Sequence, residues 1–377
     1  MSYNILNICT VSGEPVKRYD GIKKYIATGD ITNNIISSYD EVDYMNKPSR
    51  ANQIAKIGEV IFAKMKKTVK VMIITEENSE YIYSTGFYIV KPKENVLTEY
   101  LYWLFNSKKF NLEKDKYCKG ATQKALNNEG LSKIEIKELP DISIQKNIVY
   151  KLNKINEIIN LKKEQLAIVD EIIKSQFVEM FENKKFNLKT LNEISVIKGE
   201  YGSGASAGEF IEGQPRYVRI TDIQEDGRLN NQSMASPKNE SNIDKYILQY
   251  GDVLFARTGA TVGKTYKYNE NDGYCIYAGY CIRFRLDLNI CNPDYIFIYT
   301  KTDNYKKWVD NKQRVVAQPN INAKEYGNDL KIPIPPIELQ NKFADFVKQI
   351  DKQKFEIQKS LDKMQDLYES LMDKYFG

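Results

Sequence analysis

The sequence predicts an α+β protein made of two similar halves, each a small globular domain followed by one long helix. Residues 58–64 (GEVIFAK) recur as residues 251–257 (GDVLFAR), 193 positions later. In both halves, short β-rich runs broken by Gly and Asn lead into a long segment without Pro or Gly, in which apolar residues recur at helical spacing. We therefore expect a first domain at residues 1–141, a helix at 142–183, a second domain at 184–336 and a helix at 337–377.

The repeat extends over the whole chain, with small changes in offset that short loop insertions explain. Residues 25–31 (YIATGDI) correspond to residues 217–223 (YVRITDI), 192 positions later. Downstream the offset is 195. It pairs the following residues: Gln123 with Gln318, Asn127 with Asn322, Pro140 with Pro335, Gln145 with Gln340, and Phe181 with Phe376. Two copies of one unit, related by a pseudo-two-fold repeat, therefore account for the chain.

Each globular copy contains short runs rich in β-branched and aromatic residues. The expected strands are residues 60–63, 69–75 and 81–90 in the first copy, and 253–257, 265–268 and 280–286 in the second. Short helices are expected at residues 97–106 and 293–301, and the Gly-rich stretch 199–208 is expected to be a loop. Each copy is thus an α+β unit with a small mixed or antiparallel sheet.

The long segments each carry an apolar stripe. The stripe of the first consists of Leu152, Ile155, Ile159, Leu166, Val169 and Ile173, and that of the second of Val347, Ile350, Ile357, Leu361, Met364, Tyr368 and Leu371. Five members of the second stripe lie 195 positions after a member of the first. A helix of about 40 residues is about 60 Å long, so its stripe needs a partner. We expect the two helices to form an antiparallel coiled coil that separates the globular domains; the alternative, each helix folding back on its own domain, does not explain the matched stripes.

Composition excludes several classes of protein. The chain has no histidine, which removes the commonest general base and a common metal ligand. Its five cysteines are irregularly spaced without a C-x-x-C pair, which argues against a disulfide framework or a zinc site and favours a reducing cytoplasm. We see no secretory signal and no apolar run of about 20 residues, so no membrane association is expected. The formal charge of +5 is compatible with a polyanionic partner without identifying one.

Three motifs suggest chemistry that their surroundings do not support. Residues 259–265 (GATVGKT) have three residues between the glycines where a phosphate-binding loop needs four, and an extended segment follows instead of a helix. Residues 202–207 match a dinucleotide fingerprint only superficially, because no helix begins there. Residues 292–295 (NPDY) come near the Asn/Asp-Pro-Pro-Tyr pocket of amino-methyltransferases, but the second proline is an aspartate. We interpret this last segment as a helix start whose Tyr295, like Tyr100 in the first copy, packs inward.

Groups suited to nucleic acid gather at two matched places in each copy. After the matched strand they are Lys64, Lys66 and Lys67 in the first copy, and Arg257, Thr258 and Lys264 in the second. At the second place Lys119, Gln123, Lys124 and Asn127 stand opposite Arg314, Gln318, Asn320 and Asn322. Lys and Arg can bind phosphates, and amides can make paired hydrogen bonds to adenine. Tyr201, Ser203 and Arg219 of the second copy complete the predicted DNA-binding set, and no catalytic or metal-ligating residue is predicted.

This pattern closely resembles the specificity (S) subunits of type I restriction-modification systems, and the resemblance covers the whole chain. It is carried by residues 217–223, 251–259 (GDVLFARTG), 318–322 (QPNIN) and, most specifically, 332–340 (IPIPPIELQ). The first copy departs from the pattern at two points. Residues 64–66 (KMK) replace the Arg-Thr-Gly turn, and residues 139–141 (LPD) replace the multi-proline entry to the helix.

The resemblance implies two target recognition domains, each reading one half of a bipartite double-stranded DNA target, with an unread spacer set by the helices. It implies a non-catalytic chain that docks two modification (methyltransferase) subunits and, through them, restriction (translocase/nuclease) subunits. S-adenosylmethionine, ATP and Mg are then bound by those partners, and this chain holds no cofactor. Two alternatives stay open: recognition domains of a self-contained methyltransferase or nuclease, and a coiled-coil scaffold that does not bind DNA.

Overall fold

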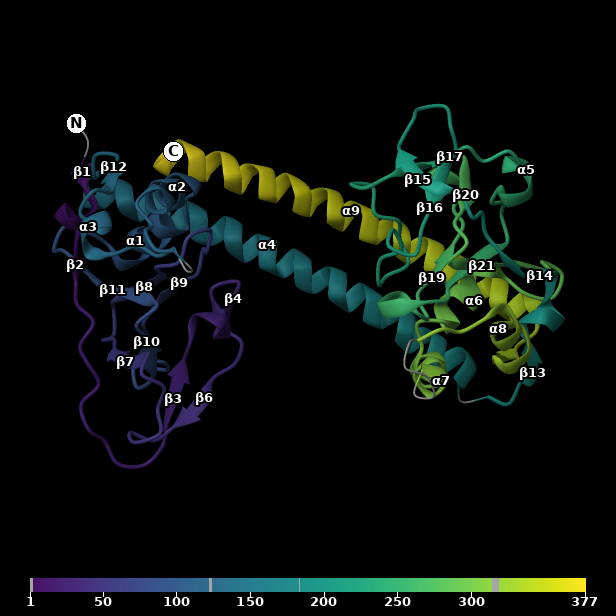
Figure 1. Cartoon of the computed structure of the whole chain (residues 1–377), viewed down its shortest axis with the longest axis horizontal. Helices are drawn as coiled ribbons and strands as arrows, with labels where there is room; N and C mark the ends of the chain where they lie inside the picture. The colour runs from purple at the N-terminus through teal and green to yellow at the C-terminus, as the bar shows by residue number, and fades with distance from the viewer. Residues whose placement is uncertain (1–2, 122–123, 183, 314–318) are drawn as a thin grey trace. The chain divides into compact units, whose positions relative to one another are not determined.

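The computed structural model describes residues 3–121, 124–182, 184–313 and 319–377. The chain divides into two compact units, which Figure 1 shows with their elements labelled. Unit 1 consists of Met1–Glu164 and Gln358–Gly377, and unit 2 consists of Gln165–Ile357. Each unit thus combines a globular domain with parts of both long helices.

The central sheet of unit 1 is antiparallel, with the strand order β2-β11-β8-β9. Its strands are β2 (Cys9–Val11), β11 (Phe87–Pro92), β8 (Val60–Ala63) and β9 (Val71–Ile73). Every residue of β8 is buried, as expected for a strand in the middle of a covered sheet. A turn with Gly58 at φ +84° precedes β8, and its matched Gly251 has φ +94°; a residue with a Cβ would be strained at either position.

A second sheet in unit 1 is mixed, with the order β6-β3-β10-β7 and with β3 and β10 parallel. Its strands are β3 (Lys23–Ile26), β6 (Asp40–Val42), β7 (Ala51–Ile54) and β10 (Ile82–Ser84). Two small pairs are added, β1 (Tyr3–Asn4) with β12 (Glu135–Ile136) and β4 (Ile31–Thr32) with β5 (Ile35–Ile36). The single strand expected at residues 81–90 was wrong: a turn at Thr85 and Gly86 divides it into β10 and β11, which belong to different sheets.

Unit 2 repeats the central sheet and the parallel pair of unit 1. Its central sheet has the order β14-β21-β18-β19, with β14 (Ser195–Tyr201), β21 (Cys281–Leu286), β18 (Asp252–Ala256) and β19 (Thr265–Lys267). A parallel pair, β16 (Arg216–Val218) with β20 (Cys275–Tyr277), corresponds to β3 and β10. Further pairs are β13 (Asn187–Thr190) with β22 (Lys331–Ile334) and β15 (Ser206–Glu209) with β17 (Ala235–Lys238). The stretch expected to be a loop at residues 199–208 therefore includes the end of β14 and most of β15.

Short helices complete each domain. They are α1 (Thr98–Asn106), α2 (Lys108–Lys116) and α3 (Asn128–Leu131) in unit 1, and α5 (Ile243–Tyr246), α6 (Pro293–Tyr299), α7 (Asp303–Gln313) and α8 (Ala323–Asp329) in unit 2. The prediction for residues 292–295 is confirmed: the Asn292 side chain accepts a hydrogen bond from Asp294 N at 2.9 Å, Pro293 begins the helix, and Tyr295 is buried. Tyr100 on α1 is buried as well.

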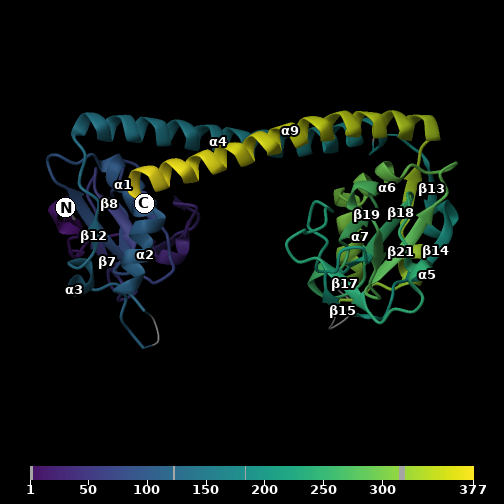
Figure 2. The same ribbon diagram turned by 90° about the horizontal axis from the view of Figure 1, so that it is seen from above.

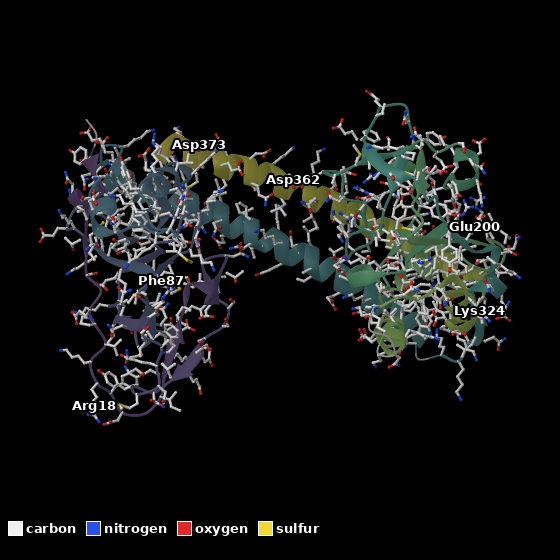
Figure 3. The ribbon with its side chains drawn as sticks, in the orientation of Figure 1. Arg18, Phe87, Glu200, Lys324, Asp362 and Asp373 are labelled. Atoms are coloured by element: carbon white, nitrogen blue, oxygen red, sulfur yellow. The ribbon has the colours of Figure 1, made fainter. Side chains whose placement is uncertain are left out.

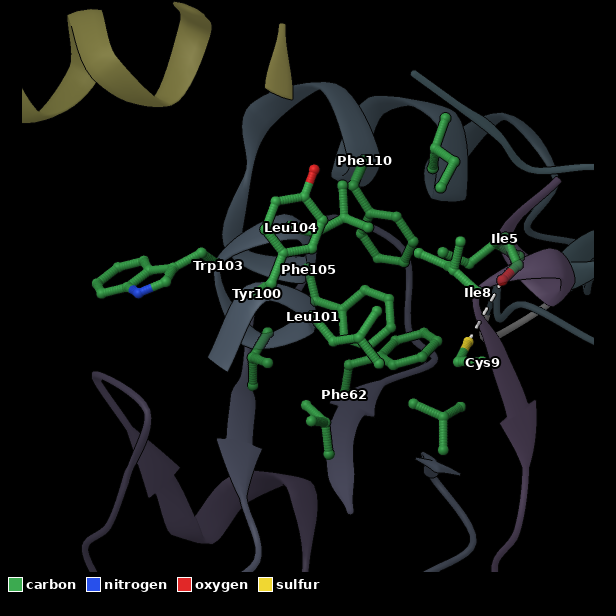
Figure 4. Packing of buried hydrophobic residues seen from close by; sticks show 14 of the residues in the cluster. Ile5, Ile8, Cys9, Phe62, Tyr100, Leu101, Trp103, Leu104, Phe105 and Phe110 are labelled. Atoms are coloured by element: carbon green, nitrogen blue, oxygen red, sulfur yellow. Dashed lines mark hydrogen bonds between the residues drawn. The ribbon is translucent and has the colours of Figure 1, made fainter. Parts of the chain in front are cut away.

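Aromatic rings form the centre of the unit 1 core, which Figure 4 shows at close range. The ring of Phe62 on β8 lies 4.6 Å from that of Phe105 on α1 and 5.4 Å from that of Phe110 on α2, centroid to centroid. Tyr100 and Leu101 join the same cluster. The helices α1 and α2 are thereby packed on the central sheet, with their aromatic faces as the contact.

The two long helices are α4 (Ile142–Phe177), continued by a π-helical turn (Val178–Glu182), and α9 (Ile337–Phe376). In unit 1, Leu152 of α4 and Met372 and Phe376 of α9 belong to the core described above. In unit 2, Phe177 of α4 lies 5.5 Å from Phe343 of α9, centroid to centroid, and 5.4 Å from Tyr295 of α6. Figure 2 shows α6 between β18 and α9. Each unit therefore contains the opening of one long helix and the closing part of the other.

A buried glutamine joins each long helix to the domain that precedes it. Gln340 is fully buried; its Nε2 donates to Ile290 O at 3.1 Å and Pro335 O at 2.8 Å, and its Oε1 accepts from Asn292 N at 2.9 Å. Gln145 repeats these bonds 195 positions earlier, to Asn95 O, Pro140 O and Leu97 N, at 2.9, 2.8 and 3.0 Å. The pairing of the two glutamines that was read from the sequence is thus a matched structural joint.

Candidate nucleic-acid interface

In unit 2 the segment after β18 is hydrogen-bonded to the segment before α8. Ile321 N donates to Arg257 O at 2.9 Å, and Gly259 N donates to Pro319 O at 3.1 Å. Between them, Thr258 and Asn320 form an antiparallel bridge. The two places singled out in the sequence therefore meet. We call residues 257–264 with 319–321 the paired loops of unit 2.

Unit 1 repeats this arrangement bond for bond. Leu126 N donates to Lys64 O and Lys66 N donates to Lys124 O, both at 2.9 Å, with a bridge between Met65 and Ala125. Residues 64–67 with 119–121 and 124–126 are the paired loops of unit 1. The predicted residues Gln123, Arg314 and Gln318 lie outside the residues that the structure describes.

The two asparagines next to the paired loops serve as helix caps. The side-chain oxygen of Asn127 accepts from Gly130 N at 2.8 Å at the start of α3. That of Asn322 accepts from Lys324 N and Glu325 N, each at 3.0 Å, at the start of α8. Their oxygens are used inside the domains, whereas the neighbouring Asn320 is exposed.

The lysines of the unit 1 paired loops differ in how their charge is used. Lys66, Lys67 and Lys124 are exposed, and no carboxylate in the described part of the chain lies within ion-pair distance of their Nζ atoms. Lys119 is paired with Glu129 at 3.0 Å. Lys64 points inward: its Nζ donates to Thr85 O at 2.8 Å and lies 4.4 Å from the ring centroid of Tyr88. Burial lowers the pKa of Lys64.

Two residues of helix α2 bind the backbone in and next to the first of the unit 1 paired loops. Lys114 is 1% exposed, and its Nζ donates to Met65 O at 3.1 Å and Thr68 O at 2.5 Å. Both carboxylate oxygens of Asp115 accept from Lys67 N at 3.0 Å, where the backbone of Lys67 has φ +59°. Burial lowers the pKa of Lys114, and the nearby Asp115 carboxylate opposes this effect. These two residues were not predicted, because nothing in the spacing of α2 marks them in the sequence.

In unit 2, Arg257 lies next to two tyrosine rings. Its guanidinium carbon is 4.8 Å from the ring centroid of Tyr201 and 6.0 Å from that of Tyr280. Tyr201 is 41% exposed and Tyr280 is 59% exposed. The hydroxyl of Tyr201 accepts a hydrogen bond from Ala323 N at 3.1 Å. Tyr280 was not predicted; an exposed aromatic residue in a turn carries no sequence signal of its own.

Three other predicted residues of unit 2 are engaged within the domain. Lys264 forms an ion pair with Glu225 at 2.7 Å. Arg219 donates to both carboxylate oxygens of Asp222, at 2.9 and 2.7 Å, and this bonding raises the pKa of Arg219. Ser203 is 1% exposed and its hydroxyl donates to Glu240. The expectation for Ser203 is corrected: the side chain is buried where β14 ends and cannot reach a ligand at the surface.

Several further charges of unit 2 neutralise one another beneath its surface. Arg285 donates to both oxygens of the fully buried Asp252 at 2.8 Å. Arg283 pairs with Glu200 of β14, which Figure 3 labels, and lies 3.8 Å from the same Asp252. These arginines are paired inside the domain and contribute nothing to a basic surface.

The five cysteines are free thiols, and four of them are buried. Burial raises the pKa of both the Cys9 and the Cys275 thiol to about 12, so neither forms a thiolate readily near neutral pH. Within the part of the chain that is described, no three or more His, Cys, Asp or Glu side chains come together as metal ligands would. Among the described helices, none has the length and apolar character of a membrane span.

Comparison with known proteins gives the same repeat. The model of the type I restriction modification DNA specificity domain matches this chain twice, at residues 8–171 and 181–364. The specificity subunit of the type I restriction enzyme MjaIX from Methanocaldococcus jannaschii is 22% identical over 317 residues, which are 77% of this chain and 70% of the relative.

Two solved structures share the fold. One is a chain from a study of complex assembly and conformational transition in a type I R-M system, with 19% identity and a TM-score of 0.62 over 99% of this chain and 96% of that chain. The other is the S subunit of a type I restriction-modification system from M. genitalium, with 13% identity and a TM-score of 0.59 over 100% of this chain and 96% of that chain. Because the two matches of the family model cover most of the sequence, the chain belongs to the type I restriction-modification DNA specificity family, that of the specificity (S) subunits.

Proposed function

We propose that each unit of this chain reads one half of a bipartite DNA target. The observation that carries the proposal is the pair of matched loops: at equivalent positions, both units join two segments, which present lysines in unit 1 and basic, amide and hydroxyl groups in unit 2. A chain built twice in this way has two similar binding surfaces, and two different sets of side chains on them allow two different half-sites to be read.

Within the unit 1 paired loops we assign phosphate contact to the exposed and unpaired lysines, Lys66, Lys67 and Lys124. A Lys ammonium on a flexible stem suits a phosphate, whose position does not depend on base sequence. In unit 2, the exposed amide of Asn320 and the hydroxyl of Thr258 can contact base edges. Lys64, Lys264 and Arg219 are engaged by other groups of the domain, so we assign them no direct role.

We further propose that α4 and α9 pair as an antiparallel coiled coil that sets the length of the unread spacer. The matched apolar stripes support this, because members of both are buried: Leu152, Ile159 and Leu361 in unit 1, and Val169, Ile173 and Val347 in unit 2. The buried glutamine at the start of each helix supports it as well, since a spacer must be attached firmly to the domain that it positions.

The modification subunits are proposed to dock on the long helices. A second apolar row on α4 is exposed to solvent, with its members spaced by three, seven and four residues: Ile158, Leu161, Ile168 and Ile172. An exposed apolar row on a helix is typical of a binding surface. Because the chain is a repeat, we propose two modification subunits, with restriction subunits bound through them. Those partners supply S-adenosylmethionine, ATP and Mg, and this chain is proposed to be non-catalytic.

The test is an exchange of halves. The chain is produced with its modification subunits, and the methylated sequences are mapped in a methylation-free host. A hybrid that keeps residues 1–181 and takes its second half from another S subunit should retain the first half-site and change the second. The chain purified alone, supplied with S-adenosylmethionine and DNA, is the control and should transfer no methyl group. A hybrid in which both half-sites change would contradict the assignment of one half-site to each unit.

A further inference from the structure

We infer that Arg257 is a pre-oriented DNA contact of unit 2, held in place by the rings of Tyr201 and Tyr280, and that Lys64 at the matched position of unit 1 makes no such contact. The inference rests on the proposed function, and it names the residue that makes the contact and the residues that position it. It also implies that the two units use equivalent loops with different chemistry.

The surroundings of Arg257 restrict its movement. Its guanidinium lies near the rings of Tyr201 and Tyr280. The backbone of Tyr201 is held by the pairing of β14 with β21, opposite Ile282, and its ring by the hydrogen bond from Ala323 N to the hydroxyl. Its Nε is buried and has no hydrogen-bond partner among the described residues. A side chain enclosed as far as Nε has little freedom left in its stem, so the terminal nitrogens are presented in a defined orientation.

The charge of Arg257 is not neutralised in the part of the chain that the structure describes, where no carboxylate lies within ion-pair distance of it. The other arginines of the unit 2 sheet, Arg283 and Arg285, are each paired with a carboxylate. An unpaired guanidinium beside two exposed aromatic rings is the arrangement expected where an acceptor binds from outside.

Lys64 provides the contrast within the same chain. Lys64 N donates to Gly86 O at 2.9 Å, as Arg257 N donates to Tyr280 O at 3.1 Å, so Gly86 occupies the place of Tyr280. Unit 1 lacks a ring at this place, and the Lys64 ammonium turns to Thr85 O instead. The same backbone position therefore carries a guanidinium without an ion-pair partner among the described residues in one unit and an ammonium used internally in the other.

The group that binds Arg257 must offer two acceptor atoms, because the planar guanidinium forms a fork of two parallel donors. A guanidinium donates through parallel N–H groups, and both the O6/N7 edge of guanine and two oxygens of a phosphate match this geometry. A Lys ammonium cannot reproduce it, because it is a point charge with rotatable donors. The substitution Arg257→Lys therefore keeps the charge and removes the fork.

The experiment measures binding of the assembled complex, chain plus modification subunits, to duplex DNA that carries its mapped target, over a range of salt concentrations. Arg257→Lys should weaken binding by about tenfold or more, within the range for loss of one bidentate contact. Tyr280→Gly, which copies the unit 1 residue, should weaken binding severalfold, whereas Tyr280→Phe keeps the ring and should bind as the unaltered complex does. Lys64→Met is the matched control and should also bind normally.

Two supporting results identify the acceptor. If it is guanine, Arg257→Ala and Arg257→Lys relax preference at one base pair of the unit 2 half-site, and the salt dependence stays the same. If it is a phosphate, all sequences bind more weakly to Arg257→Ala, and the slope of log affinity against log salt falls by about 0.9.

The inference is overturned if Arg257→Lys and Arg257→Ala bind like the unaltered complex, or if Lys64→Met loses as much affinity as Arg257→Lys. A thermal unfolding curve for each variant separates loss of contact from loss of fold. If the unaltered complex shows no preference for any DNA sequence, the proposed function itself fails and this inference fails with it.

Discussion

Replacing Gln340 with Met should loosen the joint between α9 and the domain of unit 2. Methionine has nearly the shape of glutamine, so the substitution leaves almost no cavity and removes only the amide. Three hydrogen bonds are lost, to Ile290 O, Pro335 O and Asn292 N, at a site that is fully buried. The bond to Pro335 O is buried and the other two are partly buried, so the backbone groups left behind are only partly open to water.

The size of the effect follows from these bonds. Each neutral hydrogen bond contributes about 1 kcal/mol net, and burying an unsatisfied partner adds to the loss, so we expect the free energy of unfolding of unit 2 to fall by at least about 3 kcal/mol. For a domain of about 150–250 residues, 1 kcal/mol shifts the melting temperature by about 2–4 °C, which gives a shift of about 6–12 °C. Gln145→Met should produce a similar loss in unit 1.

The assay is urea unfolding of the purified chain, combined with hydrogen exchange to show which unit has been destabilised. Gln349→Met, on the exposed side of α9, is the matched control and should change stability little. A loss of stability for Gln340→Met no larger than that for Gln349→Met, or a loss that appears in unit 1 instead of unit 2, would contradict this role of Gln340.

Three other predictions concern DNA, the spacer and pH. Lys66→Ala and Lys124→Ala should each lower the salt slope of DNA binding by the assembled complex by about 0.9 without changing sequence preference; an unchanged slope would rule out phosphate contact. Inserting four helical residues after Gln165 and four after Ser360 lengthens each helix by about 6 Å, nearly two base pairs at about 3.4 Å each, so methylation mapping should find the spacer longer by one or two base pairs; full activity at the original spacing would contradict the spacer role. Burial raises the pKa of Tyr100 and of Tyr299 to about 12, above the ordinary value of about 10, so the unfolded chain releases these protons first and stability should fall as pH rises from 10 to 12. Urea unfolding at several pH values checks this last prediction, and a constant stability up to pH 12 would contradict it.

Much of the fold could be predicted because its signals are local in sequence or repeated. The prediction of β8 at residues 60–63 is confirmed without change, and the long helices begin at Ile142 and Ile337 as expected. The strand expected at residues 81–90 failed for a physical reason: Gly86 and Ser84 form a turn, in which Gly86 N donates to the Ser84 hydroxyl at 3.1 Å, inside a run that is otherwise apolar. Composition alone does not reveal that such a run belongs to two sheets.

The sequence by itself determined that the chain is a repeat, where its helices and most strands lie, and which loops are equivalent. Only the tertiary structure decided which side chains on those loops are available. Lys64 and Arg257 occupy the same repeat position, yet the Lys64 ammonium is bonded to Thr85 O, whereas the Arg257 guanidinium lies near two exposed tyrosine rings. Ser203 is buried, and Lys114, buried on α2, supports a loop nearly fifty residues away in sequence. The physical reason is that the burial and pairing of a polar side chain depend on neighbours distant along the chain, whereas periodicity and self-similarity are properties of the chain itself.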